Sequence, residues 1–390
     1  MEKIKKNAIF IAATGQNVGK TTICLGVIAA LRRRFSTVGF IKPVGQHHLN
    51  IDNHTIVDKD AYLFKHHFQI DSEWKDMSPV IIPSGFTREY LDGKFTVEEM
   101  VNRIKMSYEK ISKSHNYTVV EGTGHVGVGS IVDLCNARIA AELNLDMVII
   151  ASGGLGSAYD ELSLSVAMCE KYGVKVRGVI LNRVLENKKE MLLDYFPKSL
   201  KKWGIPLIGT IPYDSFLSKS SVKDFEILFE GSLISGNAYR NRHFESVRLV
   251  AGSLEEFQKE MVQSQLIITP ASREDIILAI LAKHKDVAQE DGSDYRGGII
   301  LTDKHPPSSK ILNEIRLVNI PVLYTSLSSY DAMKKITSFI AKIRIEDVMK
   351  IDKAIHLVEK NINFDALCEN QNIPTKLMLD KNRIDFSVKR

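Results

Sequence analysis

The sequence predicts an α/β protein in which a doubly wound parallel sheet is joined to a second, smaller α/β domain. Between residue 8 and about residue 215, short apolar runs alternate with helical stretches. Continuous apolar strands between helices are typical of a parallel sheet that is covered on both faces. Beyond a polar, turn-rich stretch near residues 213–245, a second alternation extends to about residue 344. These two alternations predict two layered domains.

The expected elements can be placed in order along the chain. In the first domain, strands are expected at 7–13, 36–44, 117–122, 146–152, 176–184 and 206–214, and helices at 21–34, 97–111 and 130–143. In the second, alternating segments are expected at 247–253, 254–262, 266–272, 273–284, 297–304, 309–317, 320–326 and 329–343. We therefore expect domains at 1–220 and 221–344, followed by a helical tail at 345–390.

Composition narrows the class of protein. Of the 390 residues, 44% are hydrophobic and 25% charged, and the formal net charge is +5. The tightest basic run, at 32–34, ends an expected helix, where cations suit the helix dipole, and no aromatic platform for a nucleic acid accompanies it. No run approaches the roughly 18 apolar residues of a membrane span, and the four cysteines have no metal-site or disulfide spacing. We expect a cytoplasmic protein that binds neither nucleic acid nor membrane.

The segment GQNVGKTT follows an apolar strand and precedes a helix, which is the context of a phosphate-binding loop. The generic spacing requires glycine at position 14, but Thr14 stands there, and we expect Gly15 to supply the bend with positive φ instead. Backbone N–H groups of such a loop cradle phosphates, Lys20 would reach the β- and γ-phosphates and Thr21 would hold Mg²⁺. The expected nucleotide-binding residues are Gly15, Gln16, Asn17, Val18, Gly19, Lys20, Thr21 and Thr22.

Three further residues lie near the C-terminal ends of expected strands, at the sheet edge where ligands bind. Lys42 could stabilise charge on a transferring phosphoryl group, or it could be an exposed lysine at a strand end. Glu121 suits a Mg²⁺-holding role. The Asn182 amide matches the adenine edge, although a turn asparagine is the alternative.

A rival pattern lies directly after Glu121. GTGHVG at 122–127 spells the dinucleotide fingerprint, and Asp146 stands near the usual acidic position. A Rossmann fingerprint normally follows the first strand, however, where this chain already has its phosphate loop. The further glycines Gly127 and Gly129 favour a substrate-contacting loop over a dinucleotide turn.

The order of the motifs, GKTT, IKPVGQ, DKDAYL, VVEGTGHVGVGS, GVILNRV and IGTIPYD, resembles the dethiobiotin synthetase family over residues 7–215. Its wider superfamily includes cobyrinic acid a,c-diamide synthases and the N-terminal domain of long phosphate acetyltransferases. The segments LIITPASREDIILAIL and DYRGGIILT resemble the DRTGG domain of those long enzymes. Cys368 lacks the glycine elbow of the glutaminase nucleophile that accompanies the diamide synthases, so glutamine-fed amidation is not expected.

The resemblance implies further site residues. Asp60, with Asp58 as a possible substitute, would join Thr21 and Glu121 around Mg²⁺, although an exposed acid at a helix start is the rival interpretation. Lys42 would contact a substrate carboxylate or carbamate. Gln46 stands where the family has a small hydroxyl residue, which leaves the substrate open. The remaining implied contacts are Gly122 and Gly124 beside the substrate or a dimer interface, and Pro212 beside the adenine pocket.

Two functions remain open. In the first, ATP and Mg²⁺ serve transfer of the γ-phosphoryl group to a carboxylate or carbamate, with Lys20 and Lys42 as catalytic residues. In the second, ATP binding regulates the DRTGG-like domain without biosynthetic activity. Both imply a small-molecule substrate or effector, and the resemblance implies a homodimer. In the second domain, Ser272 is expected to cap a helix with Asp275 three residues on, and Arg296 with two glycines could line an anion site.

Overall fold

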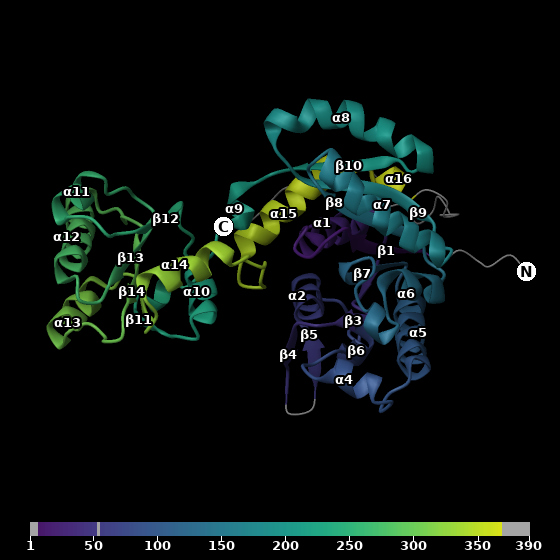
Figure 1. Cartoon of the computed structure of the whole chain (residues 1–390), viewed down its shortest axis with the longest axis horizontal. Coiled ribbons are helices and arrows are strands. Elements are labelled where there is room, and N and C mark those ends of the chain that lie inside the picture. Colours follow the sequence, from purple (N-terminus) through teal and green to yellow (C-terminus); the bar gives the residue numbers. More distant parts are fainter. Residues whose placement is uncertain (1–6, 53–54, 369–390) are drawn as a thin grey trace, which may run out of the picture. The chain divides into compact units, whose positions relative to one another are not determined.

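The computed structural model describes residues 7–52 and 55–368, and the chain divides into two compact units. The first extends to Asp214 and resumes at Ile343, and the second is Ser215–Lys342 (Figure 1). The second unit is therefore inserted into the sequence of the first. The sequence predicts a separate helical tail at residues 345–390, whereas the structure assigns the described part of this segment to the first unit. A helical pattern does not reveal which element a helix packs against.

The first unit is built on a six-stranded parallel sheet, which confirms the predicted fold class. Its order is β10-β9-β8-β1-β7-β2. The strands pair in parallel register, as in Ile9 with Val119 and Ile11 with Val148. The bounds are β1 (Ala8–Ala13), β2 (Val38–Ile41), β7 (Tyr117–His125), β8 (Met147–Ser152), β9 (Val176–Val184) and β10 (Leu207–Pro212).

Helices cover this sheet. In Figure 1, α1 (Lys20–Arg32) lies on one side of the sheet and α5 (Val97–Ser114) and α6 (Asn136–Leu143) lie on the other. A capping box between Thr96 and Glu99 starts α5. The helix expected at 130–143 is broken: a 3₁₀ turn (Ser130–Val132) precedes α6, whose first turn is capped by Cys135. The other helical elements of this sheet are α7 (Gly156–Lys171), α8 (Glu186–Leu200) and a 3₁₀ turn (Lys201–Trp203).

The strand expected at 36–44 ends early, at Ile41. The Lys42 N–H donates to the Met77 carbonyl at 2.8 Å instead of a strand neighbour, and Pro43 has no N–H to give. The chain then leaves the sheet for a small subdomain with two short strand pairs. Its elements are β3 (Val44–Gly45) paired with β6 (Val80–Ile81), β4 (His48–Asn50) paired with β5 (Ile56–Asp58), and α2 (Lys59–Phe68), α3 (Trp74–Met77) and α4 (Phe86–Leu91).

The second unit has a five-stranded sheet of order β11-β15-β14-β13-β12, parallel except at β11. Alternate residues of β13 and β14 feed two apolar clusters, one on each face of the sheet: Ile267 and Ile299 belong to one cluster, Ile268 and Ile300 to the other. The strands are β11 (Leu233–Ser235), β12 (Ser246–Leu249), β13 (Gln265–Pro270), β14 (Gly298–Thr302) and β15 (Val322–Tyr324). The helical elements are α9 (Ser215–Ser218), α10 (Val222–Leu228), a 3₁₀ turn (Asn237–Tyr239), α11 (Leu254–Lys259), α12 (Glu274–Asp291), α13 (Ser309–Val318) and α14 (Ser329–Ser338).

The expected cap at Ser272 is wrong. α12 begins at Glu274, with Arg273 in the capping position and no side-chain cap. The Arg273 N–H bonds back to the Pro270 carbonyl at 3.0 Å, so a turn extends one residue past Ser272 before the helix starts. The Arg273 guanidinium then pairs with Asp275 at 2.8 Å.

After the second unit, the chain returns to the first as α15 (Val348–Asn361) and α16 (Phe364–Cys368). α15 packs along α1 and reaches β10, and α16 lies against β9 and β10. The basic run after α1 binds this tail: Arg33 pairs with Glu359 and Arg34 with Asp365, both at 2.9 Å. Arg32 donates to the Phe68 carbonyl at 2.7 Å, so all three arginines of the run are engaged within their own unit.

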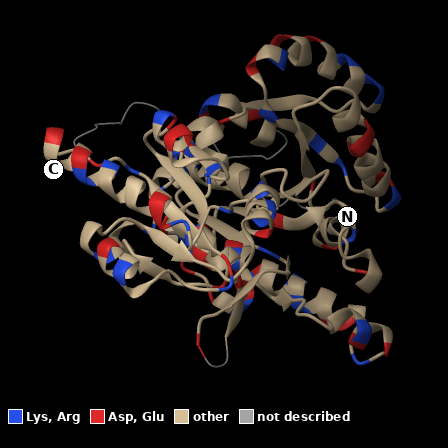
Figure 2. Cartoon of the chain, turned by 60° about the vertical axis from the view of Figure 1, so that its left-hand side comes forward, with Lys and Arg blue, Asp and Glu red and all other residues tan. Residues whose placement is uncertain are grey.

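Charged residues of both signs are interspersed along the helices of each unit (Figure 2), in keeping with the modest net charge of +5. Among the described residues, no helix is long and apolar enough to cross a membrane.

Candidate functional site

The phosphate loop runs from β1 into α1, and two of its residues have positive φ. These are Asn17, at 57°, and Gly19, at 104°. Gly15 is not among them, so the expectation that it supplies the bend is wrong. A Cβ atom on Gly19 would lie 2.2 Å from Nδ2 of Asn182, so both backbone conformation and space require glycine there.

Thr14 occupies the place of the generic first glycine and has two hydrogen bonds. Its N–H donates to the Ile150 carbonyl at 2.9 Å, which extends the ladder between β1 and β8. Its hydroxyl donates to the Glu161 carboxylate of α7 at 2.9 Å. Thr14 thus fixes the start of the loop by side-chain contact, where a glycine could offer none.

Lys20, the first residue of α1, turns its ammonium toward backbone carbonyls. Nζ donates to Gly124 O at 2.7 Å and lies 3.5 Å from Gly15 O. Burial lowers the pKa of Lys20 to about 8, against the opposing attraction of Glu121. The carbonyl groups of Gly124 and Gly15 therefore hold the ammonium of Lys20 beside the loop that would cradle phosphate.

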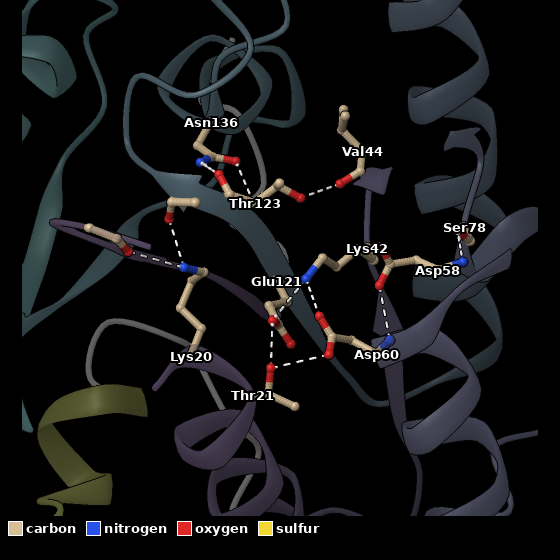
Figure 3. Close-up of polar contacts among 12 residues, drawn as sticks. Lys20, Thr21, Lys42, Val44, Asp58, Asp60, Ser78, Glu121, Thr123 and Asn136 are labelled. Atoms are coloured by element: carbon tan, nitrogen blue, oxygen red, sulfur yellow. Dashed lines mark hydrogen bonds and ion pairs between the residues drawn. The ribbon is translucent and has the colours of Figure 1, made fainter. Parts of the chain in front are cut away.

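Beside the loop lies a compact charged cluster of Thr21, Lys42, Asp60 and Glu121 (Figure 3). The Lys42 ammonium contacts the Asp60 carboxylate and lies 3.0 Å from Glu121 Oε1. The Thr21 hydroxyl lies 3.2 Å from Asp60 Oδ1 and 3.4 Å from Glu121 Oε1. Four elements converge here, because these residues start α1, follow β2, begin α2 and lie in β7.

Burial and the ion pairs together set the pKa values of this cluster. Glu121 is fully buried, which raises its pKa to about 7 although Lys42 opposes the rise. Burial alone would lower the pKa of Lys42, but the carboxylates of Asp60 and Glu121 outweigh it and hold that pKa well above its usual value. Lys42 is therefore a cation held between two acids, and not an exposed strand-end lysine.

Asp58 and Asp60 have different tasks. The Asp58 carboxylate caps α2 by accepting the Asp60 N–H at 2.9 Å, and the Asp58 N–H donates to Ser78 Oγ at 3.0 Å. Capping fixes the first turn of α2 and so directs Asp60 into the cluster. Asp58 is buried and structural here, which leaves Asp60 as the acid that faces Lys42.

The donor set fits a magnesium ion. Two carboxylates and a hydroxyl are hard oxygen ligands of the kind that Mg²⁺ prefers, and they lie next to a phosphate loop. Glu121 also has a second oxygen, Oε2, that is buried without a hydrogen-bond partner among the described residues. A buried carboxylate oxygen without a partner is costly, and a bound cation would satisfy it.

The segment after Glu121 does not form a dinucleotide turn, because β7 continues through Gly122 and Gly124 to His125. Asn136 of α6, which sequence reasoning missed, shapes this segment. Its Nδ2 donates to the Thr123 carbonyl at 2.8 Å, and its Oδ1 accepts the Thr123 N–H at 3.1 Å (Figure 3). The same Nδ2 donates to the His125 carbonyl at 2.7 Å. These bonds present the Gly124 carbonyl to Lys20.

Three other predicted residues lie outside the charged cluster. The Asn182 Nδ2 donates to the Val18 carbonyl at 2.7 Å, so this amide holds the phosphate loop, and its contact with adenine stays a prediction. Pro212 ends β10 beside Val184 of β9. Gln46 is exposed on the bend between β3 and β4.

In the second unit, the segment DYRGG is held by packing. The Arg242 guanidinium contacts Asp294 and donates to the Gly297 carbonyl at 3.0 Å. A Cβ atom on Gly298 would lie 2.6 Å from the Phe244 ring. Arg296 is exposed, and its N–H donates to the Asp294 carboxylate at 2.7 Å. An acid at this position would oppose an anion, so the structure lends the expected anion site no support.

Comparison with known proteins identifies a family for each of the two units. The AAA domain family matches residues 7–221, and the DRTGG domain matches residues 227–339. Phosphate acetyltransferase of Nitratidesulfovibrio vulgaris is 24% identical over 370 residues, which cover 93% of this chain and 51% of the relative. ATP-dependent dethiobiotin synthetase of Nitrosopumilus maritimus is 25% identical over 221 residues, which cover 55% of this chain and 92% of the relative.

Among solved structures, the MinD cell division protein of Aquifex aeolicus is similar over 54% of this chain and 84% of its own, at 16% identity and a TM-score of 0.34. The chain spans about half the length of the phosphate acetyltransferases that it matches. The resemblance predicted from the motifs is confirmed. The chain belongs to the P-loop family described as the AAA domain, and its second unit is a DRTGG domain.

Proposed function

We propose that the first unit binds ATP with Mg²⁺ and transfers the γ-phosphoryl group to a carboxylate or carbamate of a small molecule. The observation that carries this proposal is the cluster of Lys42, Asp60 and Glu121 beside the phosphate loop of Lys20 and Thr21. A loop alone would serve binding. A second buried cation beside the loop can in addition stabilise charge on a transferring phosphoryl group.

Each residue has a role in this proposal. The loop N–H groups and Lys20 bind the phosphates, and Thr21, Asp60 and Glu121 hold Mg²⁺, which neutralises phosphate charge when bound. Lys42 stabilises charge on the transferred group and orients the acceptor. Gln46, Gly122 and Gly124 border the acceptor, and Asn182 with Pro212 borders the base.

Phosphate release by the purified protein tests the proposal. We expect ATP hydrolysis that depends on Mg²⁺ and rises when the correct carboxylate or carbamate acceptor is added. The pair 7,8-diaminopelargonate and bicarbonate is the first acceptor to try. Lys20→Ala should abolish hydrolysis, whereas Lys188→Ala, a change at an exposed lysine of α8, should not. A Lys20→Ala variant that binds and hydrolyses ATP at the wild-type rate would refute the assignment of the loop.

A regulatory function is the second candidate, and the insertion of one domain into the other favours it. The DRTGG domain is inserted between β10 and α15 of the P-loop unit, and the phosphate acetyltransferase relatives match across both units. In this case ATP would change amide exchange in β13 and β14 of the second unit, and no acceptor would stimulate phosphate release. Stimulation by an acceptor without any change in the second unit would instead favour the enzyme.

We further propose a homodimer in the cytoplasm. The dimer follows from the resemblance to dethiobiotin synthetases. The four cysteines are free and buried, which suits a reducing compartment. Sedimentation velocity of the purified chain checks the dimer, and a single species with the mass of one chain would refute it.

A further inference from the structure

The ammonium of Lys42 is held by the two acids that would also hold a metal ion. Two carboxylates contact it, and the Thr21 hydroxyl lies beside the same two acids (Figure 3). These three residues are the hard oxygen donors that fit Mg²⁺ in this site. The same two acids therefore suit either of two cations, the lysine ammonium or a metal ion.

The negative charges of Asp60 and Glu121 explain why a cation must lie between them. Glu121 is fully buried, the Asp60 side chain is only 19% exposed, and the two carboxylates face each other across Lys42. Two acids this close in a buried site repel each other strongly unless a cation lies between them. Lys20 is not that cation, because its ammonium donates to the Gly124 carbonyl.

We propose that the Lys42 ammonium is exchangeable: it lies between Asp60 and Glu121 while these acids hold no metal ion, and it would turn toward the phosphate loop when they hold one. The proposal rests on the proposed function in one respect, since it takes Asp60 and Glu121 to be the metal ligands. It adds that Lys42 would be free to reach the phosphoryl group only when Asp60 and Glu121 hold the metal in its place.

The backbone around Lys42 allows such an exchange. Its N–H is fixed to the Met77 carbonyl at 2.8 Å, and Pro43 follows it. The anchor point therefore stays in place while the four-carbon side chain changes rotamer. Because a lysine has a flexible stem and a compact charge, it can leave one anionic site for another without a change of fold. The phosphates of a nucleotide on the neighbouring loop would provide the second anionic site.

Manganese binding without nucleotide tests the exchange directly. Mn²⁺ uses the same oxygen ligands as Mg²⁺, and its free and bound forms are distinguished by electron paramagnetic resonance. If the ammonium fills the position in about nine of ten molecules, its removal strengthens the apparent affinity about tenfold. We therefore expect Lys42→Met to bind Mn²⁺ at least about tenfold more tightly than the wild type, and Lys42→Arg, which keeps the charge, to show no such gain.

Two further variants make the result decisive. The double variant Lys42→Met with Glu121→Gln should lose the gain, because it lacks one of the two acids. Lys42→Gln, which keeps a hydrogen-bonding head group without charge, replaces Lys42→Met if the latter does not fold and should show the same gain. Mn²⁺ affinity equal to wild type in the uncharged variants would overturn the proposal. Separately, ATP that fails to bind the wild type would refute the proposed function and leave the metal result standing.

Discussion

Gly26 of α1 lies directly against Val358 of α15. A Cβ atom on Gly26 would be 2.2 Å from the Cβ of Val358 and 2.4 Å from its Cγ1. No real pair of side chains approaches so closely, so the two helices meet backbone against side chain at this point. α1 carries Lys20 and Thr21, and α15 is the segment by which the chain returns from the DRTGG domain.

Gly26→Ala should therefore destabilise the first unit by about 1–3 kcal/mol, as overpacking of a core does. The two tryptophans, Trp74 and Trp203, both belong to this unit, so urea unfolding followed by their fluorescence reports on it. Val358→Gly in the same chain removes the Cβ of Val358 as well and should recover part of the loss, less the roughly 1 kcal/mol that glycine costs in a helix. Without the contact, alanine would stabilise a helix by about 0.5–1 kcal/mol over glycine, and a gain of that kind would contradict the prediction.

Asn182→Ala should weaken binding of ATP and GTP to the same degree, because the Asn182 amide holds the Val18 carbonyl of the phosphate loop. Loss of one such hydrogen bond costs about 1 kcal/mol, or about fivefold in affinity. Titration with fluorescent analogues of both nucleotides measures the two losses. A loss confined to ATP would show that the amide reads adenine, as the sequence suggested, and that its bond to the loop contributes little.

Local patterns predicted the sheet and part of the site. Most strands of the first unit contain continuous apolar runs, and Lys20 and Thr21 lie in a motif with a fixed spacing. Glu121 closes the apolar run YTVV, although β7 itself continues to His125. The subdomain between β2 and α5 escaped prediction. Its stretch from 46 to 60 is polar and has no strong period, and its start depends on the distant bond from Lys42 to Met77.

The missed site residues share one cause, which is that each acts on a partner far away in the sequence or through its backbone. Glu161 is 147 positions from Thr14, and Asn136 binds carbonyls and an N–H that any residue would offer. Neither has a motif that could identify it. The same holds for α15, whose amphipathic pattern predicts a helix and does not tell that α1 is its partner.

Thr14→Gly restores the generic spacing of the loop, yet it should weaken ATP binding. It removes the hydroxyl that donates to Glu161 and adds backbone freedom at the start of the loop. We expect a loss of about fivefold in affinity, equivalent to about 1 kcal/mol. Glu161→Gln keeps an acceptor oxygen and should bind ATP nearly as the wild type does, whereas Glu161→Ala should resemble Thr14→Gly. Equal or tighter binding by Thr14→Gly would show that Thr14 has no part in holding the loop.

His284 should make the stability of the DRTGG domain depend on pH. Burial lowers the pKa of His284 to about 4, although Asp294 opposes the shift, and its Nε2 is buried without a partner among the described residues. Well above the ordinary histidine pKa of about 6.5, His284 is neutral in both the folded and the unfolded chain. As the pH falls from there toward 4, the unfolded chain takes up the proton first, so the domain loses up to about 3 kcal/mol.

Amide exchange measures this loss in the intact protein. Protection of β13 and β14, corrected for the intrinsic rate at each pH, should be lower at pH 5 than at pH 7. His284→Gln cannot take up the proton, so the part of the decrease that comes from this site should vanish in that variant. Gln265 and Tyr295 flank the same region and do not titrate in this range, which leaves Asp294 as the neighbouring acid to control. An unchanged decrease in His284→Gln would assign the pH dependence to Asp294 or to another acid instead.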